Sequence, residues 1–151
     1  MSTVLDPSHI LLDVPVTTQD EVFHAIAAHA VTLGLTTDPA VLVEGLAARE
    51  AQGTTGLMDG IAIPHAKSAA VAQAALVVLR THDGVAWETL DGQPVRLAIS
   101  LLIPEGEAGT THLKLLSKVA RTLMKAPVRA ELLAAETPEA LVEILGEHVL
   151  A

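Results

Sequence analysis

The sequence predicts an α/β fold: a single three-layer α/β/α domain over residues 1–151, with a small mixed sheet. The chain has 151 residues, the usual size of one domain with its own core. The spacing of its apolar residues changes along the chain, which gives the order strand, two helices, several strands, three helices. Because helical segments both precede and follow the strands, we expect helices on both faces of the sheet.

The first third of the chain predicts a strand followed by two helices. Residues 9–14 (HILLDV) form a short apolar run typical of a strand. The next segment has apolar residues at helical spacing, with Thr18 as its N-cap and Gly34 where a helix commonly stops. A second helix begins after the capping residue Asp38 and ends before Gly53.

The middle of the chain is predicted to be extended. In GIAIP, residues 60–64, the proline disfavours helix at the residue before it. Residues 74–80 and 95–104 are runs of branched and leucine side chains long enough for strands. The stretch between them contains Asp-Gly twice, which predicts turns and places residues 82–83 (His-Asp) in a loop.

The last third of the chain predicts three helices. They cover about residues 112–124, 128–135 and 138–148, and Thr137 caps the last of them. No internal repeat or low-complexity tract interrupts this order, so a single domain accounts for the whole chain.

Composition and charge exclude several classes of function. The chain has 18 acidic and 9 basic residues, a formal charge of −9, so it lacks the basic patch that nucleic-acid binding needs. One Phe, one Trp and no Tyr leave no platform for stacking bases. There is no cysteine, no signal-peptide pattern and no apolar run of about 18 residues that could span a membrane. We therefore expect a cytoplasmic protein without a nucleic-acid partner and without direct membrane insertion.

Two polar residues fall on helix faces that should be buried. Arg49 lies within the apolar arc of the second predicted helix, and His112 lies within that of a later helix, in its first turn. Ordinary roles are open to both, because inward histidines are often satisfied core residues and an arginine can bond the last carbonyls of its helix. Their chemistry also suits phosphate, since arginine offers a fork of donors and histidine a nucleophilic nitrogen.

A third residue, His65, directly follows Pro64 at the end of GIAIPH. Pro64 fixes one backbone angle and Gly60 permits close backbone approach, which limits how far the ring can move. An exposed histidine in an ordinary turn is the alternative reading. Together with Arg49 and His112, however, His65 makes a candidate phosphate pocket in which it is the nucleophile.

Other kinds of site lack their sequence patterns. The histidines show neither H-x-x-x-H nor H-E-x-x-H spacing, so we expect no metal. The G-x-S-x-G nucleophile elbow and the Walker phosphate loop are also absent, which argues against a serine hydrolase and against ATP binding by this chain. We expect no cofactor.

Three blocks of the sequence resemble one known family. RE at residues 49–50, GTTGLMDGIAIPHAKS at 53–68 and LLIPEGEAGTTHLKLLSKVARTL at 101–123 are similar to the enzyme IIA component of the fructose–mannitol family. That family belongs to the bacterial phosphoenolpyruvate-dependent sugar phosphotransferase system. The resemblance covers essentially the whole chain, and ETLDGQPVRLAISLLIPEG leans towards the fructose branch.

The resemblance implies a phosphotransferase that works as a phosphohistidine relay. His65 matches the phosphorylated histidine, which takes a phosphoryl group from the phosphocarrier HPr and passes it to a cognate enzyme IIB that serves a membrane IIC. Arg49 and His112 match residues that stabilise the negative charge of the phosphoryl group. The resemblance also implies that His65 is phosphorylated at Nε2. Two alternatives stay open: a regulatory, nitrogen-related enzyme IIA, and a non-catalytic interaction module.

Overall fold

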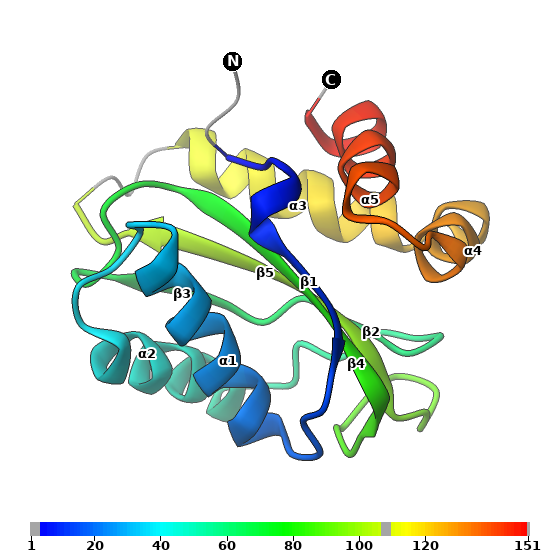
Figure 1. Cartoon of the computed structure of the whole chain (residues 1–151), viewed down its shortest axis with the longest axis horizontal. Helices are drawn as coiled ribbons and strands as arrows, with labels where there is room; N and C mark the ends of the chain where they lie inside the picture. The colour runs from blue at the N-terminus through cyan, green and yellow to red at the C-terminus, as the bar shows by residue number, and fades with distance from the viewer. Residues whose placement is uncertain (1–3, 107–109, 151) are drawn as a thin grey trace.

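The computed structural model describes residues 4–106 and 110–150, with the backbone alone for residues 110–112 and 150. Helices and strands follow one another along the chain as drawn in Figure 1. Their bounds are η1 (Pro7–His9), β1 (Ile10–Val14), α1 (Gln19–Thr32), α2 (Pro39–Ala51), β2 (Ile61–Ala62), β3 (His65–Ser68), β4 (Ala75–Val85), β5 (Val95–Pro104), α3 (Thr110–Leu123), α4 (Ala126–Ala134), α5 (Pro138–Leu145) and the π-helical turn η2 (Gly146–Leu150). The predicted order of strand, two helices, several strands and three helices is confirmed.

The sheet has five strands and is mixed, as predicted. Its order is β1-β4-β5-β2, and β3 also pairs with β5. Only the β4–β5 pairing is antiparallel, while β1 is parallel to β4, and β2 and β3 are parallel to β5. One long hairpin, β4–β5, therefore forms the centre of the sheet, and the other strands are added at its two edges.

Strands β2 and β3 are two pieces of one edge strand. Ile61 pairs with Leu97 and His65 with Leu101, so both pieces keep the same register on β5. Between them lies Pro64, which has no backbone N–H to contribute to the ladder. Its carbonyl still accepts a bond from the Leu101 amide at 3.2 Å. The break places His65 at the first position of β3.

Helices cover both faces of the sheet, which confirms the three-layer prediction. In Figure 1, α1 and α2 lie on one side of the strands and α3, α4 and α5 on the other. Two separate core clusters match these layers. Leu42 and Leu46 of α2 pack in one cluster with Leu102 of β5, while Val119 and Leu123 of α3 pack in the other with further β5 side chains.

Capping residues set the helix ends close to where the sequence predicts them. The Thr18 side chain accepts from the Glu21 amide, and Glu21 bonds back to the Thr18 amide, so α1 begins with a capping box. The Asp38 side chain accepts from the Val41 amide in the same way at the start of α2. Gly34, just beyond α1, has a φ of 76°, a conformation that glycine adopts without steric cost.

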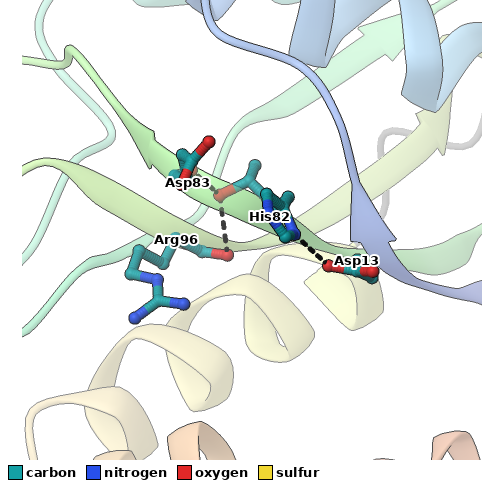
Figure 2. A network of polar contacts seen from close by, with 5 residues as sticks. Asp13, His82, Asp83 and Arg96 are labelled. Carbon is teal, nitrogen blue, oxygen red and sulfur yellow. Dashed lines mark hydrogen bonds and ion pairs between the residues drawn. The ribbon is translucent and has the colours of Figure 1, made fainter.

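The prediction of a loop at His82–Asp83 is wrong. Both residues belong to β4, which runs on to Val85 and pairs there with Val95 of β5. The register of β4 on β5 shifts between Arg80 and Val85, so the first Asp-Gly lies in an irregularity within the strand and not in a turn that ends it. His82 Nδ1 contacts Asp13 Oδ1 of β1 at 2.5 Å, as Figure 2 shows. The second Asp-Gly does form a turn, with Gly92 at a φ of 76°.

No helix in the part of the chain that the structure describes is long and apolar enough to cross a membrane.

Gly56 provides a test of the packing around the segment that leads to His65. A Cβ added there would overlap the carbonyl oxygen of Glu88 and the side chain of Thr89, so Gly56→Ala should lower the free energy of unfolding by about 1–3 kcal/mol. Gly146 is the control, because nothing lies near its added Cβ, and Gly146→Ala should change that free energy by no more than about 1 kcal/mol. Urea unfolding measures both. Equal stability of the two variants would show that the close approach of Gly56 to Glu88 is not a constraint.

Candidate functional site

His65 is a half-buried side chain at the break in the edge strand. Its Nδ1 lies 2.8 Å from the carbonyl oxygen of Ile63. A carbonyl oxygen can only accept, so Nδ1 carries a hydrogen and donates it. In the neutral ring, Nε2 is then left with a free lone pair. The backbone itself thus selects the tautomer whose Nε2 is a nucleophile.

Arg49, in the last turn of α2, is brought directly to this ring. Its Nε donates to His65 Nε2 at 3.1 Å, and its Nη1 donates to the carbonyl oxygen of Gly53 at 2.8 Å. The second bond is the ordinary C-terminal role that sequence reasoning left open for Arg49. The first places a fixed positive charge and a donor at the nucleophilic nitrogen. One side chain therefore both bonds a carbonyl at the end of its helix and contacts the nucleophilic nitrogen of His65.

The surroundings keep the His65 ring neutral. Burial lowers its pKa most strongly, and the positive charge of Arg49 lowers it further. The bond to Ile63 and the charge of Glu50 act in the opposite direction, but the net pKa lies below the ordinary value for histidine. A neutral ring is the form that can attack phosphorus, because an imidazolium has no lone pair to offer.

Glu50 is a residue of the site that the sequence reasoning did not select. Its carboxylate accepts from the Thr55 amide at 2.8 Å, the Thr55 hydroxyl at 2.6 Å and Trp87 Nε1 at 3.1 Å. Trp87 in turn packs edge-on against Phe23, with ring centroids 5.7 Å apart. Glu50 thus joins the end of α2 to the loop before β2. Its place beside Arg49 in the RE pair was the only sequence signal for it.

His112 lies in the first turn of α3, where the sequence predicts it. Its side chain is outside the part of the chain that the structure describes, so its place beside His65 stays a prediction. The hydroxyls near His65 in the sequence have other partners. Thr55 bonds to Glu50, Thr54 to the carbonyl oxygen of Glu88, and the Ser68 hydroxyl accepts from the Ala70 amide.

Among the residues described, no group of three or more His, Asp or Glu side chains could hold a metal ion. His82, for example, bonds to the carboxylate of Asp13 on the edge strand β1, opposite to the edge formed by β2 and β3. The group bonded to His65 Nε2 is the Arg49 guanidinium, whose positive charge and donors suit an anion on Nε2 better than a cation.

Comparison with known proteins places this site in a family. A family model described as "Phosphoenolpyruvate-dependent sugar phosphotransferase system, EIIA 2" matches residues 3–148. The fructose-specific EIIABC component of Bacillus subtilis is 44% identical over 105 residues, which cover 70% of this chain and 16% of that longer protein. The fructose-specific EIIA component of Haloferax volcanii is 33% identical over 149 residues, 99% of this chain and 96% of that one.

Solved structures share the fold. The nitrogen regulatory protein IIA-Ntr of Neisseria meningitidis superposes with a TM-score of 0.86 at 36% identity, covering 94% of this chain and 96% of that one. The IIA-Mtl chain in a complex with phosphorylated IIB-Mtl from Escherichia coli superposes with a TM-score of 0.77 at 20% identity, covering 95% and 97%. At 20% identity, the likeness to IIA-Mtl concerns the fold alone.

Fold and sequence together define a phosphotransferase domain that works as a histidine-phosphorylated intermediate. The chain belongs to the EIIA type 2, or fructose–mannitol, family of the phosphoenolpyruvate-dependent sugar phosphotransferase system.

The electrostatics of the site can be checked by titrating the histidines by NMR. His65 should titrate below the ordinary histidine pKa, because burial and Arg49 both lower it. His82 should titrate above the ordinary pKa, because the hydrogen bond and the charge of Asp13 stabilise its protonated form. The two pKa shifts have opposite directions, so each histidine is an internal comparison for the other in the same titration. A His65 pKa at or above the ordinary value would contradict the neutral nucleophile.

Proposed function

We propose that His65 accepts a phosphoryl group from HPr on Nε2 and passes it to a cognate enzyme IIB. The observation that carries the proposal is the pair of bonds on the ring, Nδ1 to the Ile63 carbonyl and Nε2 to Arg49. The proposal takes residues 1–151 as one EIIA-type domain acting in the cytoplasm.

The transfer balances with groups that this chain supplies. The Nε2 lone pair forms a bond to phosphorus while the bond between phosphorus and its carrier atom on HPr breaks, and that electron pair leaves with HPr. The Nδ1 hydrogen stays in place, and the Ile63 carbonyl accepts it while the ring gains positive charge. Arg49 Nε donates to this lone pair in the structure, so that bond must open before Nε2 attacks, and the freed donor can then bond a phosphoryl oxygen at about 3 Å, the usual length of such a bond.

Charge stabilisation is the main task of such a site. Phosphoryl transfer depends on in-line positioning and on donors for the three equatorial oxygens. The chain has a formal charge of −9, so its overall field opposes a phosphoryl group, and local donors must outweigh it. Arg49 is the permanent charge in this role, and His112, in the first turn of α3, is the second donor we assign.

Transport of a fructose-type sugar is the role we assign to the relay. It is supported by the fructose-specific EIIA of Haloferax volcanii, which matches along nearly its whole length. The enzyme IIB partner is supported by the complex that the Escherichia coli IIA-Mtl forms. The membrane IIC would act through IIB, since the sugar is not bound by this chain in the proposal.

A regulatory function is the second candidate, because IIA-Ntr of Neisseria meningitidis is 36% identical and superposes with a TM-score of 0.86. Such a protein would be phosphorylated on the same histidine but would act by binding other proteins. Sugar phosphorylation with a matched IIB–IIC pair separates the two roles, because only the transport protein supports it. A protein that acquires no phosphoryl group at all would be the third case, an interaction module.

Incubation with phosphoenolpyruvate, enzyme I and HPr should place one phosphoryl group on this chain. We expect the label to be labile to acid and stable to base, as an N-phosphorylated histidine is, and mass spectrometry should locate it at His65. His65→Ala should abolish it, while His82→Ala, which changes a histidine of β4 that is bonded to Asp13 of the opposite edge strand β1, should not. Full labelling of the His65→Ala protein would rule out the assignment.

Arg49→Ala and His112→Ala should slow transfer while leaving the fold intact. Each removes a donor to developing charge, and by analogy with oxyanion-hole donors each should cost on the order of 10²-fold in rate. Arg49→Lys should recover only part of the rate, since lysine keeps the charge but not the planar fork of donors. Rapid-quench transfer from labelled HPr measures these rates, and circular dichroism controls for folding. Wild-type rates in both alanine variants would refute the supporting role.

A further inference from the structure

Arg129 of α4 is a buried cation on the opposite layer from Arg49. The residue is 7% exposed, its Nε donates to Asp59 Oδ2 at 2.8 Å, and its Nη1 donates to the carbonyl oxygen of Leu123 at 3.0 Å. Asp59 lies 70 residues earlier in the chain, in the segment that precedes His65. The Asp59 side chain is 52% exposed, so the ion pair is only partly buried and contributes little to stability by itself. The positions of the two residues that it joins are the more informative feature.

Asp59 lies at the tip of a small hairpin, residues 55–63. The hairpin is closed by bonds from the Ile63 amide to the Thr55 carbonyl at 3.0 Å and from the Leu57 amide to the Ile61 carbonyl at 2.8 Å. Asp59 has a φ of 56°, a left-handed conformation that most residues other than glycine avoid and that aspartate and asparagine adopt more readily than other side chains. The Arg129 guanidinium holds the residue that makes this turn.

The second arm of the hairpin leads directly to the site. Its last residue, Ile63, supplies the carbonyl that accepts from His65 Nδ1 at 2.8 Å. At the base of the hairpin, Thr55 is bonded to Glu50, the neighbour of Arg49. The hairpin is thus fixed at its base by α2 and at its tip by α4.

We propose that Arg129 and Asp59 are positioning residues for phosphoryl transfer. Their ion pair clamps the tip of the 55–63 hairpin, so that the Ile63 carbonyl stays in line with His65 Nδ1 and the lone pair of the ring stays on Nε2, the nitrogen that faces Arg49. The other donor of Arg129 holds Leu123 at the end of α3, the helix that carries His112 in its first turn. One guanidinium thereby joins the hairpin to the helix on the other side of the site. This inference rests on the proposed function of His65.

The chain offers a matched control for the clamp. Asp13 and Asp59 are the two non-glycine residues with positive φ in the part of the chain described, and both have a φ of 56°. Both also pair with a basic side chain, Asp13 with His82 and Asp59 with Arg129. Asp13 belongs to β1, at the sheet edge opposite β2. Asp13→Asn and Asp59→Asn are therefore the same chemical change at the same φ, the first far from the site and the second near it.

Two readouts on the full chain test the clamp. The first is the rate of phosphoryl transfer from labelled HPr, and the second is the NMR titration and tautomer of His65. We expect Asp59→Asn and Arg129→Lys to slow transfer about tenfold, since small displacements of a reacting group carry costs of this order. We also expect both to lower the population of the His65 tautomer with its hydrogen on Nδ1, because a loosened hairpin weakens the bond to the Ile63 carbonyl that holds this hydrogen. Asp13→Asn should match the wild type in both readouts.

Each outcome decides the proposal. Wild-type rates, or a wild-type His65 tautomer, in folded Asp59→Asn and Arg129→Lys proteins would overturn it, and so would equal effects from Asp13→Asn. If Arg129→Lys fails to fold, Asp59→Asn decides alone, because asparagine tolerates the left-handed conformation. Failure of the proposed function is distinguishable, since it would appear as a wild-type protein that acquires no label on His65.

Discussion

The bond between His65 Nδ1 and the Ile63 carbonyl is the constraint on which the site depends. It spans only two residues, on either side of Pro64. The ladder to β5 uses the carbonyls of Gly60 and Pro64, which accept from the amides of Leu97 and Leu101. Backbone groups alternate in direction along a strand, so Ile63 faces away from β5, and its amide bonds to Thr55 instead. Its carbonyl is therefore free to accept from the ring, and the ring has one tautomer available to it. The chemical identity of Nε2 as nucleophile is therefore a consequence of strand geometry.

The site solves an electrostatic problem that the composition creates. A chain with twice as many acidic as basic residues has to hold a phosphoryl group, which adds further negative charge. The carboxylate nearest to Arg49 in the sequence, Glu50, is occupied by three donors from Thr55 and Trp87. Because Glu50 has these partners, Arg49 is left to face His65 rather than a carboxylate. Glu50 and Arg49 are thus neighbours in the sequence, but Glu50 bonds to Thr55 and Trp87 while Arg49 bonds to His65.

The sequence predicts the parts of this structure that depend on local chemistry. The helix starts at Thr18 and Asp38 follow from side chains that bond amides within one turn, so their positions can be read from spacing. Arg49 stands out because a charge on an apolar arc conflicts with burial. The end of β4 could not be predicted, since pairing with β5 decides it against the preference of Asp-Gly for a turn. The roles of Glu50 and Arg129 could not be predicted for a similar reason. Their partners lie 5 to 70 residues away in the sequence, and no helical or strand periodicity relates the paired residues.

The position of the site at a sheet edge follows from the layers that must meet there. In the centre of the sheet, β4 and β5 separate the α1–α2 layer from the α3–α5 layer, and the two core clusters have no residue in common. At the edge formed by β2 and β3, no further strand among the described residues pairs with the sheet, and the 55–63 hairpin there contacts both layers. Arg49 and Glu50 reach it from α2, while Arg129 reaches the same hairpin from α4. A broken edge strand is thus the place in this fold where a histidine can be held by groups from both faces and still present one nitrogen to a partner.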